Sequence, residues 1–387
     1  MTDESLSLMT KMKIPFNRPF MTGKELWYIS EAHHRGMLAG DGDFTKRCHE
    51  WIENQTGCRK ALLTHSCTGA LEMAAMLLDI QPGDEVIMPS YTFVSTANAF
   101  VLRGAVPVFV DIREDTLNIN DELIESAITE KTKAIVPVHY AGMGCDMDKI
   151  MAIADRHGLS VVEDAAQGLM ATRGGCALGA MGHLGAISFH ETKNVISGEG
   201  GALMINDERY IERAEIIREK GTNRSRFYRG EVDKYTWVDL GSSFLPGELI
   251  AAFLFAQMEE AENITSKRMK VWDYYHEAFG RLEGKERICR PIVPEGCSHN
   301  AHMYYLLLEN AEVRQSLLNH LKGVGIMSVF HYIPLHSSPA GEKYGRACGD
   351  LAVTNKVSST IARLPLYPEV EGAGEVIQAV EDFFEKG

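Results

Sequence analysis

The 387-residue sequence lacks the patterns that mark several common classes of protein. Its eight cysteines form no Cys-x-x-Cys pair, which argues against a zinc ribbon or a thioredoxin-like redox motif and favours free thiols in a reducing compartment. No run reaches about 18 apolar residues, so no membrane span is expected. Residues 1–13 are polar and lack the apolar core of a signal peptide. We therefore predict a cytoplasmic protein.

Several nucleotide-binding and metal-binding motifs are also missing. No Gly-x-Gly-x-x-Gly follows a predicted strand, and no Walker-type Gly-x-x-x-x-Gly-Lys occurs, so binding of nicotinamide cofactors or ATP is not indicated. His-Glu-x-x-His is absent too, and we predict no metal site. The formal net charge of −14 provides no general attraction for nucleic acid or for an anionic membrane. An anionic substrate would need positive charge supplied locally.

Short apolar runs alternate with helical patterns between about residues 58 and 206. Helical patterns at 68–79, 121–129 and 146–157 separate several of the runs, and Asp121 and Asp146 are suitable N-terminal acids. Such alternation with short connections predicts an α/β fold, with a mostly parallel sheet covered by helices on both faces. The predicted strands are 61–64, 85–89, 106–110, 134–139, 159–164, 186–189 and 202–206.

The sequence changes character near residue 250. A long helical pattern covers residues 246–282, and further strands are predicted at 303–308 and 327–332. The chain is long enough to bury two cores. We interpret it as a large domain of residues 14–250 followed by a smaller α+β domain of residues 251–387.

One lysine lies where a Schiff base with an aldehyde cofactor is chemically reasonable. Lys193 stands between the apolar run that ends in Ser188-Phe189 and a glycine-rich turn at residues 197–201, and Asp164 ends another apolar strand. Together they suggest pyridoxal phosphate (PLP), because the lysine would hold the aldehyde and the carboxylate would keep the ring nitrogen protonated. Taken singly, Lys193 is more often a surface lysine and Asp164 more often a cap, so the inference depends on the pair.

The strand-to-helix junction at residues 64–71 offers a phosphate site. It leads into a helix through small residues, and the first amides of a helix point outward unpaired with partial positive charge. Cys67 and Thr68 would contribute backbone N–H groups and the threonine hydroxyl. An ordinary capped helix start explains the same residues when they are considered alone.

The order of these motifs is similar to that in the DegT/DnrJ/EryC1/StrS family of sugar-nucleotide aminotransferases. The phosphate turn, an aromatic residue after Pro89-Ser90-Tyr91-Thr92, Glu163-Asp164-Ala165-Ala166-Gln167, the lysine segment and the glycine-rich turn follow one another as in that family. The resemblance covers about residues 14–368. It implies the fold type I architecture of aspartate aminotransferase and PLP-dependent transamination.

The resemblance implies a role for individual residues. Lys193 looks like the Schiff-base lysine that also moves the proton, and Asp164 looks like the partner of the pyridine nitrogen. Phe93 would stack on the cofactor ring, and Gln167, one helical turn beyond Asp164, would lie near the ring and its O3′ side. The residues that would hold the phosphate are Cys67, Thr68 and Ser188.

The resemblance also implies a homodimer with active sites at the subunit interface. Many members place an asparagine of the neighbouring subunit on the phosphate in a Gly-x-Asn-x-Arg context. This sequence reads Gly241-Ser242-Ser243-Phe244-Leu245 there. Ser243 replaces the asparagine and keeps one hydroxyl donor, whereas Leu245 replaces the arginine.

The substrates implied by the resemblance are a dTDP-linked 4-keto-6-deoxyhexose and L-glutamate. Gly40-Asp41-Gly42 and residues 93–105 and 218–225 are most similar to members that form dTDP-4-amino-4,6-dideoxygalactose. We predict Arg224, His331 and Tyr332 as substrate-binding residues.

A cluster of cations and aromatic rings accompanies Arg224 and would suit a nucleoside diphosphate. A solvated charged loop explains the same composition. The other members of the cluster are Lys220, Arg226, Phe227, Tyr228, Arg229, Lys234, Tyr235 and Trp237.

Other functions are compatible with part of the pattern. Related PLP-dependent sugar dehydratases carry histidine in place of the lysine, so Lys193 argues against that activity. A non-enzymatic cofactor-binding regulator would usually carry a DNA-binding segment, and no basic helix-turn-helix pattern is visible. A gluco product or a different sugar stays open, because the sequence does not decide which face of the sugar Lys193 addresses.

Overall fold

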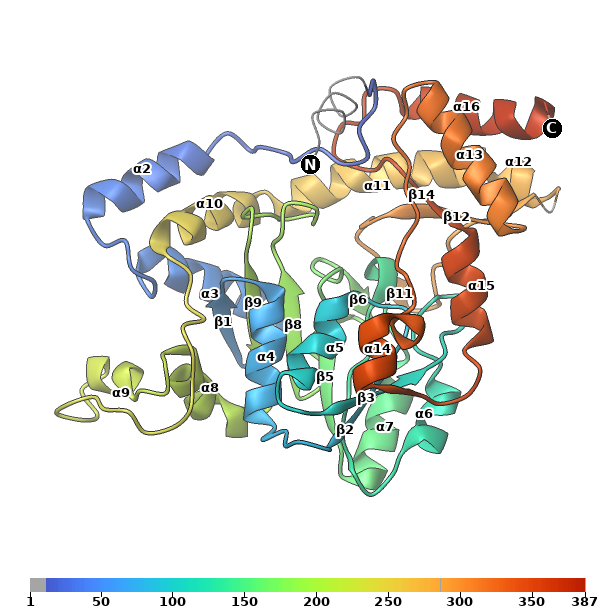
Figure 1. The fold of residues 1–387 in the computed structure, drawn as a ribbon. Helices are drawn as coiled ribbons and strands as arrows, with labels where there is room; N and C mark the ends of the chain where they lie inside the picture. Colours follow the sequence, from blue (N-terminus) through green and yellow to red (C-terminus); the bar gives the residue numbers. More distant parts are fainter. Residues whose placement is uncertain (1–11, 286, 387) are drawn as a thin grey trace.

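The computed structural model describes residues 12–285 and 287–386, so most of the segment on which the absence of a signal peptide was predicted lies outside the described residues. Its centre is an eight-stranded sheet with strand order β1-β9-β8-β5-β4-β2-β3-β13 (Figure 1). Only β9 runs antiparallel to its neighbours among the described strands of this sheet. The prediction of an α/β fold with a mostly parallel sheet is therefore confirmed. The strands are β1 (Lys60–Thr64), β2 (Glu85–Pro89), β3 (Val106–Val110), β4 (Thr132–Ile135), β5 (Ser160–Asp164), β8 (Leu184–Ser188), β9 (Gly201–Ile205) and β13 (Arg346–Ala347).

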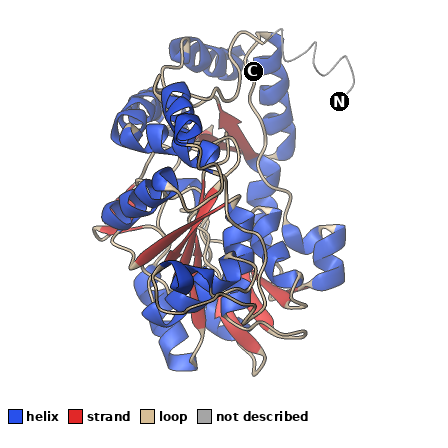
Figure 2. Cartoon of the chain, turned by 90° about the vertical axis from the view of Figure 1, so that its left-hand side faces the viewer, coloured by secondary structure: helices blue, strands red, loops and turns tan. Residues whose placement is uncertain are grey.

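Helices cover both faces of this sheet, and Figure 2 shows the strands as a layer between them. Leu62 of β1 points into the core beneath α4 and α5, whereas the next residue, Leu63, points toward α3 and α10 on the opposite face. Ile135 of β4 packs in the cluster formed with α6 and α7. Because both faces are buried, the strands form the continuous apolar runs seen in the sequence. The helices are α3 (Asp43–Thr56), α4 (Cys67–Leu77), α5 (Val94–Val101), α6 (Asp121–Ala127), α7 (Met147–His157), α8 (Ile211–Arg218) and α10 (Glu248–Glu259).

A second core forms around a small antiparallel sheet of order β10-β12-β14. Helices from the C-terminal part of the chain pack on it, and Ile14 near the N-terminus joins the same cluster. Its strands and helices are β10 (Ile288–Cys289), α11 (Ala261–Ala278), α12 (Gly280–Glu283), β12 (Tyr304–Leu308), α13 (Ala311–Gly323), α15 (Ala352–Thr360), β14 (Ile361–Leu364) and α16 (Ala373–Lys386). The remaining elements are α2 (Glu25–Arg35), β6 (Thr172–Arg173), β7 (Cys176–Ala177), α9 (Arg224–Tyr228), β11 (Cys297–Ser298) and α14 (Pro339–Tyr344).

Three sequence predictions differ from the observed elements. The helical pattern of residues 246–282 is divided into α10, α11 and α12, with a break at Glu260. The strand predicted at 134–139 ends at Ile135. The strand predicted at 327–332 is wrong: Val329 makes a single bridge to Arg363, and Tyr332 takes a positive φ of 37°. The division into domains near residue 250 stays a prediction, although α10 belongs to the core of the large sheet.

In the described part of the chain, no helix is long and apolar enough to cross a membrane. The same residues contain no group of three or more His, Cys, Asp or Glu side chains that could hold a metal ion.

Glu248 at the start of α10 ties this helix to the beginning of α3. Its carboxylate accepts hydrogen bonds from the backbone nitrogens of Gly42 (3.1 Å), Phe44 (2.8 Å) and Thr45 (3.1 Å). It also accepts from the Thr45 hydroxyl. The first N–H groups of α3 have no partner inside their own helix, so this buried carboxylate satisfies them and complements the helix dipole.

We expect Glu248→Ala to destabilise the protein by about 2–4 kcal/mol, because it leaves several buried N–H groups without an acceptor. Thermal unfolding followed by circular dichroism should show a midpoint several degrees lower. Glu295→Ala, which removes an exposed loop carboxylate, is the matched control and should leave the midpoint unchanged. Equal midpoints for the two variants would contradict the capping role of Glu248.

Candidate active site

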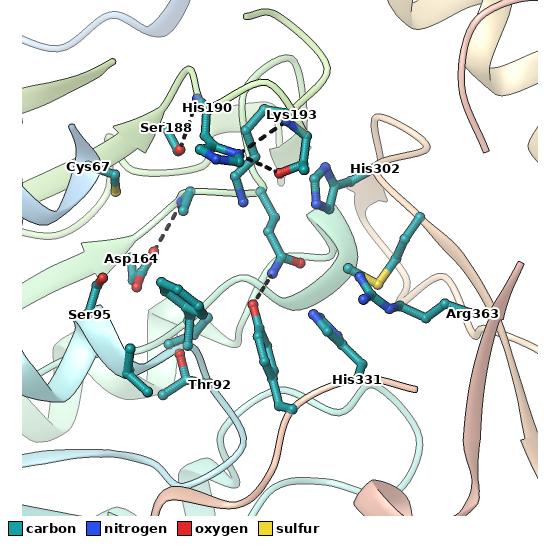
Figure 3. A pocket seen from close by; sticks show the side chains of 18 of the residues that line it. Cys67, Thr92, Ser95, Asp164, Ser188, His190, Lys193, His302, His331 and Arg363 are labelled. Atoms are coloured by element: carbon teal, nitrogen blue, oxygen red, sulfur yellow. Dashed lines mark hydrogen bonds between the residues drawn. The ribbon is translucent and has the colours of Figure 1, made fainter. Parts of the chain in front are cut away.

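A cavity of about 940 Å³ lies between the carboxyl ends of the large-sheet strands and the small sheet. The large sheet contributes the ends of β5 and β8 and the start of α4, and the small-sheet side contributes β14 and the segment around residue 331 (Figure 3). Open α/β sheets bind ligands at this edge. The predicted site residues that line the cavity are Cys67, Thr68, Phe93, Asp164, Gln167, Ser188, Lys193, His331 and Tyr332.

The carboxylate of Asp164 is held at the end of β5 by two hydrogen bonds. Its Oδ2 accepts from the Thr96 hydroxyl at 2.7 Å, and its Oδ1 accepts from the Ala166 backbone nitrogen at 3.1 Å. Thr96 in turn shares a hydrogen bond of 2.8 Å with the Thr92 hydroxyl. Asp164 is buried. A buried carboxylate fixed in this way suits a cationic ring nitrogen.

A fully buried hydrogen bond between His139 and Glu163 supports the strand end that carries Asp164. His139 Nε2 lies 2.7 Å from Glu163 Oε2, and the His139 backbone nitrogen donates to the Asp164 carbonyl at 3.1 Å. The Cys145 backbone nitrogen donates to His139 Nδ1 at 3.1 Å, so the imidazole is neutral and its Nε2–H donates to Glu163. Glu163 also accepts hydrogen bonds from three backbone nitrogens between residues 179 and 182. The position of Asp164 is therefore set by a rigid frame.

Lys193 lies in the turn after β8, where its backbone nitrogen donates to the His190 carbonyl at 2.8 Å. Its side chain points into the cavity (Figure 3). Burial lowers the pKa of Lys193, and the positive charge of Arg363 acts in the same direction, whereas Cys67 and Asp164 oppose them. A lysine amine with a lowered pKa can act as a nucleophile and can accept a proton.

The start of α4 forms a small polar cradle. Ser66 caps the helix by accepting from the Gly69 backbone nitrogen at 3.0 Å, and the Thr68 and Ser95 hydroxyls lie 2.8 Å apart. A Cβ atom at Gly201 of β9 would overlap the backbone nitrogen of Cys67. The strand therefore runs directly against the helix start, in a position open only to glycine.

Burial raises the pKa of the Cys67 thiol well above its ordinary value, so the thiol stays neutral beside an anion. Ser188 also lines this end of the cavity, and its hydroxyl oxygen accepts from the His190 backbone nitrogen at 3.4 Å. Unpaired helix amides with hydroxyl groups around them form a suitable phosphate site.

Aromatic and amide groups form the wall between the cradle and the small sheet. Phe93, the residue before α5, is 56% exposed and lies with its ring centroid 6.3 Å from that of Tyr332. Gln167 Oε1 accepts from the Ala141 backbone nitrogen at 2.6 Å, and its Nε2 donates to the Tyr332 hydroxyl at 3.0 Å. Gln167 lies in a turn rather than in a helix.

The cavity fits PLP. An amine with a lowered pKa, a fixed carboxylate, a helix N-terminus and an exposed aromatic face are all available to one ligand, and these are the groups that an aldehyde, a pyridine nitrogen, a phosphate and a flat ring require.

Other residues of the site were not identified from the sequence. Thr96 and Ser95 carry no local signal, because their partners are brought together only by the fold. Gly201 belongs to the glycine-rich turn at residues 197–201, but the sequence does not predict its contact with α4. Arg363 also lines the cavity, and a cation inside the apolar strand β14 was a signal that could have identified it.

Ser243 and Arg224 do not line this chain's cavity. Ser243 is exposed and pairs with Glu219 in an isolated bridge. Arg224 belongs to α9, in a segment that projects from the body of the molecule (Figure 1). Its Nη2 donates to the Tyr228 hydroxyl at 2.9 Å, and its Nη1 lies 3.4 Å from Glu219.

Two neighbouring arginines of this segment are already paired with glutamates of the same chain. Arg226 lies 3.0 Å from Glu212, and Arg229 lies 2.8 Å from Glu215. The charge of the cluster is thus largely balanced internally, as a solvated charged loop would require.

Gly201→Ala should weaken PLP binding by about 10- to 100-fold, because the added methyl group displaces the helix amides that face the phosphate. The measurement is a titration of the cofactor-free protein with PLP, followed by absorbance. Gly323→Ala provides a control, since a Cβ atom there meets open space. Unchanged affinity in Gly201→Ala would show that the cradle does not hold the phosphate.

Comparison with known proteins agrees with this arrangement. Residues 20–381 match the model of the DegT/DnrJ/EryC1/StrS aminotransferase family. The chain is 36% identical to the uncharacterised protein MJ1066 of Methanocaldococcus jannaschii, over 88% of this chain and 90% of that protein. It is 32% identical to the spore coat polysaccharide biosynthesis protein SpsC of Bacillus subtilis, over 95% of this chain and 96% of that protein.

Among solved structures, the PLP form of the putative sugar aminotransferase Spr1654 from Streptococcus pneumoniae superimposes with a TM-score of 0.88. The two sequences are 26% identical, and the match covers 96% of this chain and 99% of that chain. With the family match over nearly the whole chain, these findings establish the class of enzyme and its cofactor. The chain belongs to the DegT/DnrJ/EryC1/StrS aminotransferase family and is a PLP-dependent aminotransferase.

Proposed function

We propose that this aminotransferase transfers the amino group of L-glutamate to dTDP-4-dehydro-6-deoxy-D-glucose and forms dTDP-4-amino-4,6-dideoxy-D-galactose. The observation that carries the transamination is the buried Lys193 amine in one cavity with the fixed Asp164 carboxylate. The names of SpsC and Spr1654 support a sugar as the acceptor. The particular sugar is supported by the resemblance of residues 93–105 and 218–225, and the product would serve surface glycan assembly from the cytoplasm.

When bound, PLP supplies the carbonyl group that takes up the amino group and the ring that draws electrons from the substrate carbon. Asp164 holds the proton on the ring nitrogen, since its carboxylate is oriented by Thr96 and Ala166. Lys193 Nζ removes the proton from the substrate carbon and returns it on the cofactor side. Its lowered pKa increases the fraction of uncharged amine that can accept this proton. The same amine serves the glutamate half and the sugar half of the reaction.

His331 and Tyr332 are the proposed contacts to the hexose. His331 is buried beside the cavity, and burial lowers its pKa well below the ordinary value. Its Nδ1 lies 2.6 Å from the Tyr140 hydroxyl, so the neutral ring has Nε2 left to meet a sugar oxygen. The Tyr332 hydroxyl already accepts from Gln167 and can donate its own proton. Which face of the sugar meets Lys193 decides between the galacto and gluco products.

A homodimer with active sites at the subunit interface is part of the proposal. Ser243 and Arg224 lie outside the cavity of their own chain, and the segment that carries them exposes large aromatic side chains such as Trp237 (77%) and Tyr228 (69%). Exposed aromatic residues are typical of interfaces. We infer that Ser243 donates to the phosphate, and that Arg224 contacts the sugar nucleotide, in the neighbouring subunit.

Lys193→Ala should lower kcat by at least about 10²–10⁴-fold, because no other group can move the proton at the same atom. The assay follows amino transfer from L-glutamate to dTDP-4-dehydro-6-deoxy-D-glucose, and the configuration at C4 of the product is read by NMR. Lys131→Ala, an exposed lysine remote from the cavity, should retain full activity. Turnover of Lys193→Ala at the wild-type rate would refute the assignment, and an equatorial amine would refute the galacto product.

Shared active sites predict complementation between two inactive variants. Ser243→Trp should lose at least about tenfold in activity, because a bulky side chain misplaces the neighbour's phosphate. Refolding an equal mixture of Ser243→Trp and Lys193→Ala should restore about a quarter of wild-type activity, since half the dimers are mixed and each has one intact site. No recovery, with mixed dimers verified by mass, would contradict the contribution of Ser243 to the neighbouring site.

A further inference from the structure

Arg363 is a charged side chain for which the described residues provide no charged partner. It lies on β14 and lines the cavity, where Figure 3 shows its guanidinium pointing inward beside His302 and His331. Its Nη2 donates to the Phe330 carbonyl at 3.2 Å, and its guanidinium lies 4.8 Å from the centre of the Phe16 ring. Within the described residues, Nε is buried without an acceptor, and no carboxylate lies within ion-pair distance.

Burying a guanidinium without an anionic partner costs free energy unless a ligand provides that partner. Burial lowers the pKa of Arg363, which means that the protein around it disfavours the positive charge. A guanidinium whose terminal N–H groups lack acceptors gains most from a planar anion that accepts two parallel hydrogen bonds. The missing hydrogen-bond acceptor and counter-charge of Arg363 therefore indicate that a ligand supplies a carboxylate or a phosphate.

Arg268 is a useful contrast on the same wall of the cavity. Its Nε and Nη2 donate to the Ala301 and His302 carbonyls at 3.0 and 2.7 Å. Its charge is thus met by backbone oxygens, so it has a structural role in holding the loop that precedes β12. Among the described residues Arg363 makes one such bond, from Nη2, so its other terminal N–H groups remain available to a ligand.

The acidic side chains of the cavity wall do not pair with Arg363. Asp164 is bound by Thr96 and Ala166 and faces the proposed position of the ring nitrogen. Glu199 lies at the rim, is 71% exposed and is 3.6 Å from His190. The histidines near Arg363 carry no negative charge, and burial lowers the pKa of both His302 and His331 well below the usual value. The anion must therefore arrive with a substrate.

The position of Arg363 relative to Lys193 distinguishes the two substrates. Arg363 is close enough to lower the pKa of Lys193, and the amino donor must bring its α-carbon to that lysine. In an amino acid the α-carboxylate is bonded to this carbon. In a nucleotide-linked 4-keto sugar the nearest phosphate is separated from the reacting carbon by the hexose ring. A cation near Lys193 therefore matches the amino acid.

We propose that Arg363 binds the α-carboxylate of the amino-acid donor and so selects amino acids as donors, an assignment that rests on the proposed function. The contact is made by the terminal nitrogens at the cavity end of the side chain, because Nε is enclosed by protein. Phe16 on its face and the Phe330 carbonyl hold the guanidinium plane in position.

The test measures binding without chemistry. Glutarate, a dicarboxylate that has no amine and cannot react, is titrated by calorimetry into the PLP-bound wild-type protein and its variants. Arg363→Gln should weaken glutarate by about 10- to 100-fold, the loss expected for hydrogen bonds to a charged group. The glutarate affinity of Arg363→Lys should lie between those of the wild type and Arg363→Gln, because lysine keeps the positive charge but lacks the planar pair of donors. Arg281→Gln, an exposed arginine outside the cavity, changes the charge equally and should bind like wild type.

A second measurement separates the donor from the sugar. The absorbance change of the cofactor is followed after adding L-glutamate, or after adding dTDP-4-amino-4,6-dideoxygalactose as donor in the reverse direction. The proposal requires that Arg363→Gln raise the glutamate concentration for half-maximal rate by about 10-fold or more. The corresponding concentration of the amino sugar should stay within about 3-fold of the wild-type value.

An equal loss for both donors would overturn the proposal in favour of a phosphate contact. Unchanged glutarate affinity in a variant with the wild-type unfolding midpoint would overturn it as well. If wild type accepts no sugar, the proposed function fails, and the glutarate and glutamate data still decide the role of Arg363.

Discussion

The site depends on keeping a buried amine and a buried carboxylate in one cavity without letting them pair. Among the described residues, Lys193 and Asp164 form no ion pair, because Asp164 is bound by Thr96 and Ala166. A direct pair would fix the amine in its charged form and remove its ability to accept a proton. The separation follows from the sheet: β5 and β8 are parallel neighbours, with Asp164 at the end of one and Lys193 in the turn beyond the other. We propose that the space between them would hold the cofactor ring.

The frame behind the carboxylate explains why this separation persists. The buried pair of His139 and Glu163 ties the strand end to the segment after β4 and to the turn at residues 179–182. Removing either member would leave buried hydrogen-bonding groups without a partner, which costs more than the hydrogen bond itself contributes. The Asp164 carboxylate thus takes its position from polar groups that are not part of the cavity lining.

Sequence patterns revealed the parts of this protein that are determined locally. Strands buried on both faces appear as short apolar runs, so the large sheet, together with Lys193 and Asp164 at its edge, could be predicted. The strand predicted at 327–332 fails because its apolar residues line a cavity, where irregular backbone and the positive φ of Tyr332 carry them past Arg363. Thr96 and Gly201 depend on contacts between elements distant in the chain, and no local pattern encodes those contacts.

Charge in the sequence is a poor guide to charge that a ligand can use. The arginines of the projecting segment look like an anion site in the sequence, yet Arg226 and Arg229 are paired with nearby glutamates. Arg363 is a single cation in an apolar strand, and it is the one whose hydrogen-bonding capacity the fold leaves unmet within the described cavity wall. A pocket that must accept two unlike substrates in turn, an amino acid and a keto sugar, needs a contact that only one of them uses. One substrate uses the guanidinium fully, whereas the other can leave it to the Phe330 carbonyl and the Phe16 ring.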